Sequence, residues 1–184
     1  MKKKPTVGLD ELVAMLASST TESPRSNLLL KSGTKFILTI PNVLSERECL
    51  RIVKWAELEG FVQVSHEATK DVAFRDNGRL QIQSPALASA LWPRFQPHVP
   101  ANKGGLLAGG LNPNFRFYKY ETGQRFGPHV DESQPVESDG GAVTLFTVLV
   151  YLNDRGLVGG ETVFYPSHPK QVHEVRNSST STTS

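Results

Sequence analysis

The stretch Asn114–Asp131, NFRFYKYETGQRFGPHVD, decides the fold that we expect for this chain of 184 residues. Its first part has aromatic side chains at alternate positions, the period of two that indicates a β-strand. A turn around Gly123 follows, and the stretch ends with His129 and Asp131. Residues two apart on an extended chain point to the same side, so this imidazole and this carboxylate can converge on one metal ion.

A histidine and a carboxylate, joined by a second histidine, form the facial triad of non-haem Fe(II) oxygenases, which leaves metal positions open for ligands. The other interpretation is a surface histidine beside an aspartate in a turn, because so short a motif also arises by chance. The context supports the metal site about as well as the turn. The pair follows a strand and a Gly-Pro turn and precedes a long apolar segment, as at the mouth of a barrel.

Length and composition indicate one domain with a sizeable core. The 20 basic and 18 acidic residues are mixed along the chain, so we expect no nucleic-acid partner. No apolar stretch of the sequence approaches the roughly 20 residues of a membrane span, which predicts no membrane contact. Cys49, the single cysteine, fits a reducing compartment, and we expect a soluble intracellular protein of the cytoplasm or nucleus.

Two helices are predicted before the central stretch. Ser45 and Glu48 have capping-box spacing, and the apolar positions after them predict a helix that Gly60 ends. A second helix is predicted from Pro85 to Leu91, stopped by Pro93.

The N-terminal residues 1–35 form a segment that we expect to be poorly ordered, apart from a short helix from Asp10 to Ala17 with Asp10 as N-cap. Residues 36–175 are expected to form the domain, and residues 176–184, rich in Ser and Thr, a disordered tail.

Short strands are predicted in the domain, at Phe36–Ile40, Phe61–Val64, Phe115–Tyr120, Val143–Leu152 and Glu161–Tyr165. The longest, Val143–Leu152, is almost continuously apolar, so we expect it to be buried on both faces. Residues 97–114 are interpreted as a loop because they are rich in Pro, Gly and Asn.

The polar segment Ala73–Arg79 has turn chemistry at Asn77-Gly78. We favour an exposed hairpin tip for it. The alternative is a loop that faces the substrate, with Arg75, Asn77 and Arg79 as candidate substrate contacts and the two arginines placed to bind a polar or acidic group.

Three motifs follow one another in the second half of the chain: Tyr-x-x-Gly-x-x-x-x-Pro-His-x-Asp at 120–131, Thr-Val-Leu-Val-Tyr-Leu-Asn at 147–153, and Gly-Gly-Glu-Thr-x-Phe at 159–164. In this order they resemble the 2-oxoglutarate and Fe(II)-dependent dioxygenases, in the branch of the prolyl 4-hydroxylase catalytic domain. The resemblance covers about residues 110–175. Leu111–Asn114 and Ala73–Asn77 further resemble a plant-type subgroup.

The fold that the resemblance implies is α+β with a mainly β core, a double-stranded β-helix (jelly roll) with flanking N-terminal helices. His129 and Asp131 match the first two iron ligands. The residues implied around the cosubstrate 2-oxoglutarate are Thr147, Leu149, Tyr151, Tyr118 and Tyr120. For each tyrosine, a core aromatic with its hydroxyl at the edge is the alternative. A metal-free β-barrel, such as a sugar-binding jelly roll, is the alternative for the whole domain.

The activity that the resemblance implies is that of an oxidoreductase. Such an enzyme hydroxylates a C–H bond of a protein or small molecule with O₂, releases succinate and CO₂, and uses Fe(II), 2-oxoglutarate and L-ascorbate.

The chain departs from the family pattern near its end. The family has its third ligand, a histidine, on a late strand, and then a basic residue that pairs with the tail of 2-oxoglutarate. His168 lies in a Pro-Ser-His-Pro loop, and His173 falls one strand too early. We interpret the chain as truncated and without its final strands. We expect weak iron binding and little activity unless His173 or a partner chain supplies the third ligand. The alternative function is a binding or regulatory remnant.

Overall fold

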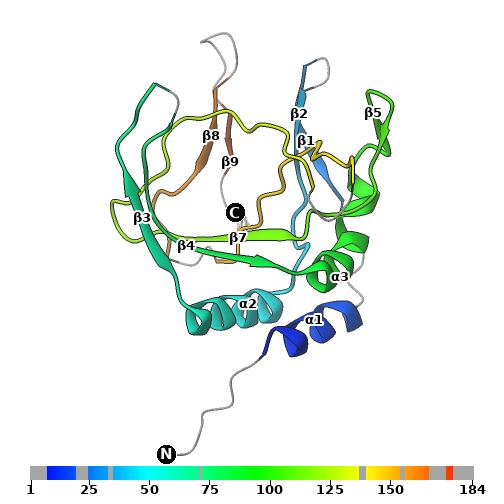
Figure 1. Cartoon of the computed structure of the whole chain (residues 1–184), viewed down its shortest axis with the longest axis horizontal. Helices are drawn as coiled ribbons and strands as arrows, with labels where there is room; N and C mark the ends of the chain where they lie inside the picture. The colour runs from blue at the N-terminus through cyan, green and yellow to red at the C-terminus, as the bar shows by residue number, and fades with distance from the viewer. Residues whose placement is uncertain are drawn as a thin grey trace, which may run out of the picture.

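The computed structural model describes residues 8–19, 25–32, 35–70, 72–136, 140–153, 156–165 and 173–175. Within these residues the chain is a mixed α+β protein with three α-helices and small antiparallel sheets (Figure 1). The helices are α1 (Leu9–Ser18), α2 (Glu46–Glu59) and α3 (Pro85–Phe95), and the short 3₁₀ helix η1 (Gln96–His98) follows α3. The described strands do not form a closed sheet or a jelly roll. None of the described helices is long and apolar enough to cross a membrane.

The capping box predicted for α2 is confirmed. The backbone N–H of Ser45 donates to the Glu48 carboxylate at 2.7 Å, and the backbone N–H of Glu48 donates to the Ser45 hydroxyl at 3.3 Å. Gly60 takes a φ of +91° after the last turn, a conformation that glycine adopts without strain. The start and end of this helix follow from local sequence.

Two other helix boundaries were predicted wrongly. Pro93 lies inside α3, which continues to Phe95. The proline removes one backbone donor, but Leu91 and Phe95 are buried and Arg94 forms an ion pair with Glu48 at 2.7 Å, which hold the last turn in place. In α1 the N-cap is Gly8, and Asp10 lies in the first turn.

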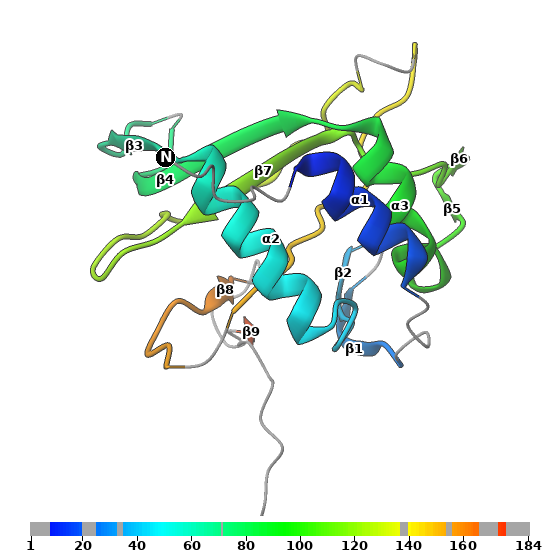
Figure 2. The same ribbon diagram turned by 90° about the horizontal axis from the view of Figure 1, so that it is seen from below.

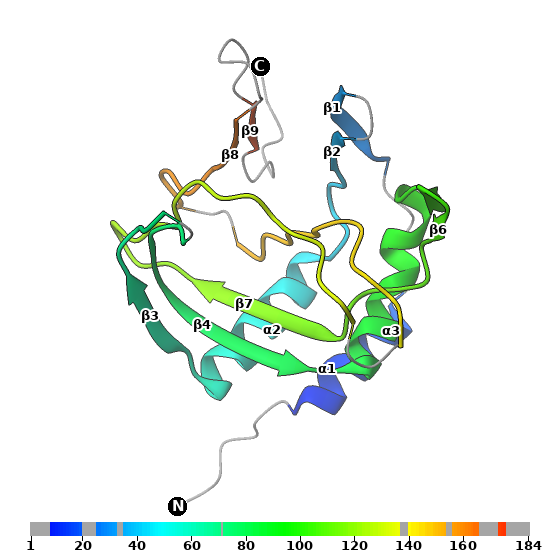
Figure 3. The same cartoon turned by 45° about the horizontal axis from the view of Figure 1, so that its top comes forward.

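The central sheet has the order β3 (Val62–His66), β4 (Arg75–Gln83), β7 (Asn114–Lys119), and both pairs are antiparallel. Leu80 lies opposite Phe117 and Arg79 opposite Tyr118, so the alternation of each strand sorts apolar and polar side chains onto different faces. The helices cover the apolar face, and the chain that follows β7 passes over the polar face (Figures 1 and 3).

The hydrophobic core lies between the helices and the apolar face of the sheet (Figure 2). Leu12 and Leu16 of α1 are buried there, and Trp55 of α2 meets Phe117 of β7 edge to face at 5.5 Å between ring centroids. The core therefore gives the sheet a rigid support, and the polar face is left for other contacts.

The remaining strands form two-stranded antiparallel sheets: β1 (Asn27–Ser32) with β2 (Lys35–Thr39), β5 (Asn102–Lys103) with β6 (Leu106–Leu107), and β8 (Thr162–Phe164) with β9 (His173–Val175). The strands predicted at 36–40, 61–64, 115–120 and 161–165 are confirmed to within about two residues. The β5–β6 hairpin lies in a segment that we expected to be loop throughout. The predicted tail at 176–184 lies outside the described residues.

Two predictions about strands and turns are wrong. Val143–Leu152 forms no strand, and Leu149 is 54% exposed: among the described residues its pairing stops at a bridge between Val143 and Pro135 and a hydrogen bond from the Thr144 N–H to the Gln134 carbonyl. Asn77-Gly78 is not an exposed hairpin tip: it lies in the middle of the central strand β4, and Asn77 is completely buried. The turn chemistry was overridden by pairing on both sides, with β3 and with β7.

Candidate functional site

The chain after β7 leaves the sheet for one turn and then returns to it. Gly123 has a φ of +84°, and the N–H of Gln124 donates to the carbonyl of Glu121 at 3.0 Å, which closes the turn. Phe126 then pairs with Arg75 at the start of β4. This excursion places the residues after Phe126 at the end of the polar face.

Gly127 allows the returning chain to approach β4 closely. Its N–H donates to the carbonyl of Phe74 at 2.7 Å, and a Cβ on Gly127 would lie 3.3 Å from Phe74 atoms. The N–H of Asp76 donates to the carbonyl of Arg125 at 3.0 Å. These two hydrogen bonds fix the position of the segment from which His129 and Asp131 project.

His129 and Asp131 face one another. Nδ1 of His129 lies 2.9 Å from the carbonyl oxygen of Gly127. A carbonyl can only accept, so we assign a proton to Nδ1, and the other ring nitrogen, Nε2, is left to face Asp131. Nε2 lies 3.3 Å from Oδ1 of Asp131, and the two side chains are 39% and 55% exposed. In the tautomer with its proton on Nδ1, Nε2 carries a lone pair, and a metal cation between Nε2 and the carboxylate would bind both atoms.

The pair fits two neighbouring corners of a metal site. Two ligand atoms about 2.1 Å from a metal and at right angles lie about 3 Å apart, close to the observed separation. The hydrogen bond from Nδ1 to a carbonyl is also the usual way in which a ligating histidine is oriented. No group of three or more metal-binding side chains occurs among the residues described, so the third corner is not accounted for there.

Arg75 lies beside the pair, in a row of stacked groups. Its guanidinium carbon is 4.0 Å from the centroid of the Phe126 ring and 5.5 Å from that of Tyr118. The Phe126 ring in turn stacks on the His129 ring, with 3.9 Å between centroids. Sequence reasoning missed Phe126, although an aromatic residue three positions before the histidine, inside a Gly-rich turn, was a usable signal.

Polar groups continue from this row along the same face of β4. Asn77 is completely buried, and its Oδ1 has no hydrogen-bond partner among the described residues, nor does the Nε of Arg79. Burial raises the pKa of the Tyr120 hydroxyl, while the charge of Arg75 opposes the change. An unshifted tyrosine already keeps its proton at physiological pH, so the Tyr120 hydroxyl is a hydrogen-bond donor there.

The other residues expected around the cosubstrate lie in the segment that forms no strand. Leu149 and Tyr151 are 54% and 37% exposed, and Thr147 is also exposed. The Tyr151 hydroxyl forms a hydrogen bond with the hydroxyl of Thr162 in β8. Tyr151 thus contacts β8, and Leu149 and Thr147 face solvent.

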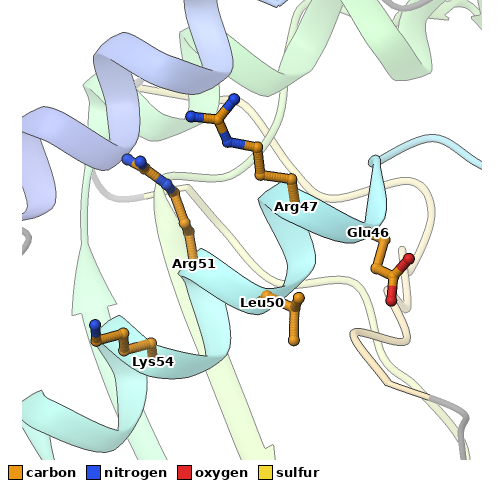
Figure 4. A pocket seen from close by; sticks show the side chains of 5 residues that line it. All are labelled: Glu46, Arg47, Leu50, Arg51 and Lys54. Carbon is orange, nitrogen blue, oxygen red and sulfur yellow. The ribbon is translucent and has the colours of Figure 1, made fainter.

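A separate shallow hollow lies on the exposed side of α2, lined by Glu46, Arg47, Leu50, Arg51 and Lys54 (Figure 4). One carboxylate among three cations is a poor metal-binding set. The described residues therefore make the segment around His129 the better candidate site.

Comparisons of this chain with protein-family models, with curated proteins and with solved structures found no match.

Proposed function

We propose that the chain is a 2-oxoglutarate- and Fe(II)-dependent dioxygenase-type domain that resembles prolyl 4-hydroxylases and is built on a double-stranded β-helix. It hydroxylates a C–H bond of a protein or small-molecule substrate with O₂ and releases succinate and CO₂, with L-ascorbate as helper. The observation that carries the proposal is the approach of His129 Nε2 to Asp131 Oδ1 while the Gly127 carbonyl holds Nδ1.

The side chains near the pair have distinct proposed roles. His129 and Asp131 hold Fe(II), and the bound metal supplies the activation of O₂ and of the 2-oxo acid. Tyr118 and Tyr120 are proposed cosubstrate contacts, each through the hydroxyl of its ring. Asn77 and Arg79 are proposed substrate contacts, each with a buried polar atom that lacks a partner among the described side chains.

Thr147, Leu149 and Tyr151 remain proposed walls of the 2-oxoglutarate pocket. Their role requires residues 143–152 to form a strand, which is the finer part of the proposed fold. An intracellular location, in the cytoplasm or nucleus, is proposed from the single cysteine, Cys49, which cannot form an internal disulfide.

Succinate production tests the enzyme proposal. The full chain is incubated with Fe(II), 2-oxoglutarate and ascorbate, with His129→Ala as the control. We expect slow turnover by the wild type, because two protein ligands hold the metal weakly, and at least a tenfold loss in the variant. Added imidazole should raise the wild-type rate, since it can occupy the third corner, and should not restore Asp131→Ala. Equal succinate from wild type and His129→Ala excludes an active oxygenase.

A catalytically impaired domain with a binding or regulatory role is the second candidate. It is favoured by one observation: the described residues supply two metal-binding side chains and no third. Calorimetric titration with Mn(II), with and without 2-oxoglutarate, separates the cases. Binding without succinate production supports an impaired domain that still holds metal, whereas no binding at all excludes the enzyme and supports a remnant that no longer holds metal.

A further inference from the structure

The side of α2 that faces solvent carries cations and leucines in one row. Positions spaced three or four apart lie on the same side of a helix, and this row lies opposite the buried Ile52 and Ala56. Its two leucines, Leu50 and Leu58, are 62% and 52% exposed. We name the row the α2 stripe, and it consists of Arg47, Leu50, Arg51, Lys54 and Leu58.

The cations of the α2 stripe have no carboxylate partner among the described residues. Carboxylates of the same helix bind other elements instead. Glu48 pairs with Arg94 of α3 at 2.7 Å, and Glu57 pairs with Lys119 of β7 at 3.0 Å. The stripe therefore presents positive charge to solvent that the described part of the chain does not neutralise.

This charge lies beside a hollow that side chains of a partner can enter. Figure 4 shows the guanidinium groups of Arg47 and Arg51 on one side of Leu50, and the Glu46 carboxylate on the other. The hollow is open and has a volume of about 350 Å³, at the lower end of the roughly 300–1,000 Å³ of ligand pockets. It suits a few side chains of a partner better than an enclosed small molecule.

Helix stability by itself does not favour the α2 stripe. Arg47 lies in the first turn of α2, where the positive end of the helix dipole disfavours a cation. Arg47 and Arg51 stand at positions i and i+4, a spacing at which like charges weaken a helix. The exposed Leu50 and Leu58 gain nothing from contact with water. A partner that brings carboxylates and an apolar side chain would offset all of these costs.

The two ends of the chain lack the charge to cover the stripe. Residues 1–7 contain three lysines and no acidic side chain, and residues 176–184 contain no acidic side chain either. The three cations of the stripe span about 10 Å along the helix axis. A short acidic segment of another protein has both the charge and the length to cover them.

Two other anionic partners suit the stripe less well. A nucleic acid would bring its phosphates along the helix to Glu46 before the cations and to Glu57 and Glu59 after them, and these carboxylates repel phosphate. A membrane-surface helix inserts a wide apolar face, but the apolar face of α2 is packed in the core. An acidic protein segment is the occupant that the charges favour.

We propose that the α2 stripe is a docking surface for an acidic segment of another protein. Carboxylates of that segment pair with the three cations, and an apolar side chain between them packs on Leu50. α2 covers the apolar face of the central sheet, whereas the His129–Asp131 pair lies at the end of the polar face (Figure 3). The docking surface therefore does not rest on the proposed function.

Binding of a defined peptide tests the proposal. The full chain is titrated into fluorescein-labelled Glu-Glu-Leu-Glu-Asp-Leu-Glu, and into its counterpart with Gln and Asn in place of the acids, under fluorescence anisotropy. The acidic peptide should bind about tenfold more tightly in dilute salt, and the difference should shrink as salt is added. Leu50→Ser should weaken its binding about threefold, because an apolar contact is lost. The preference should disappear in the stripe variant, which combines Arg47→Gln, Arg51→Gln and Lys54→Gln.

A matched control variant removes the same number of charges from exposed positions outside α2. It should bind both peptides like the wild type. The stripe variant should unfold at a urea concentration no lower than the wild type, because it removes repulsion within α2, so its loss of binding is not a loss of fold. The control variant combines Arg25→Gln, Lys31→Gln and Lys70→Gln.

Three results overturn the proposal: no preference for the acidic peptide, a preference that the stripe variant retains, or an equal loss of preference in the control variant. Duplex DNA and phosphatidylserine vesicles are titrated in parallel. If either binds more tightly than the acidic peptide, and loses this binding in the stripe variant, the proposal is also overturned and the stripe is assigned to that partner. None of these measurements uses succinate production or metal binding, so a failure of the proposed function leaves their result unchanged.

Discussion

Glu48 shows how far a single residue can be predicted from sequence. Its capping role follows from its spacing to Ser45, which is local. Its ion pair with Arg94, 46 residues away, does not follow from any local pattern, although this pair joins α2 to α3 and Arg94 also donates to the carbonyl of Leu16 in α1. The same holds at the candidate site, where the spacing predicted the pair His129 and Asp131 but not the row of rings beside it.

The buried ion pair between Glu48 and Arg94 makes the free energy of unfolding depend on pH. Burial by itself would raise the pKa of Glu48, but hydrogen bonds from Arg94 and Ser45 outweigh it and lower the pKa from 4.5 to about 2. The folded-state pKa is thus below the unfolded one. The carboxylate therefore contributes its full stability above about pH 4.5, and this contribution is lost as the pH falls towards about 2.

Glu48→Gln should therefore destabilise the fold by about 3 kcal/mol at pH 7, because it leaves Arg94 buried without its counter-charge. The difference from the wild type should shrink as the pH falls towards 2, measured by urea unfolding over that range. Glu57→Gln is the control. It removes an exposed partner of Lys119 and should leave the midpoint nearly unchanged. A Glu48→Gln effect that is constant with pH would contradict this assignment.

Among the elements, those stabilised by local contacts were predicted best. α2 has its own cap, and β7 has its own alternation, and both form where expected. Val143–Leu152 depends instead on distant contacts. An apolar run becomes a strand only if another strand completes its hydrogen bonds. The sequence shows that this segment favours an extended strand, but it cannot show whether a second strand lies beside it.

The later part of this segment, Val148–Leu152, has no backbone partner among the described residues and should make the chain self-associate. Val148, Leu149 and Val150 are each at least 38% exposed, and the segment carries no charge to prevent pairing with a second copy. Leu149→Lys should suppress the rise of the sedimentation coefficient with protein concentration. Val158→Lys, which adds the same charge at a 99% exposed valine outside the segment, should not. If both variants associate like the wild type, another surface is responsible.

Within the described structure, the helical half of the chain is well packed and the segment after β7 is not. The buried core comes from α1, α2, α3 and the residue Leu44 before α2, and the segment after β7 contributes only Leu152, partly buried, against it. The helices of the first half thus supply a packed layer. The motifs of the second half specify chemistry, and their fold depends on contacts that local sequence does not encode.

This unevenness predicts two classes of backbone amide in hydrogen exchange. Those amides of β4 and β7 that pair within the central sheet should exchange at rates near the limit set by global unfolding. Amides of Val148–Leu152 have no backbone partner among the described residues and should exchange within seconds.

Adding Mn(II) and 2-oxoglutarate should slow exchange around Phe126 to Asp131 if these ligands bind at the His129–Asp131 pair, and should leave β1 and β2 unchanged as an internal control. Uniform protection along the chain would show that residues 143–152 are paired in solution, and would restore the strand that the sequence predicts.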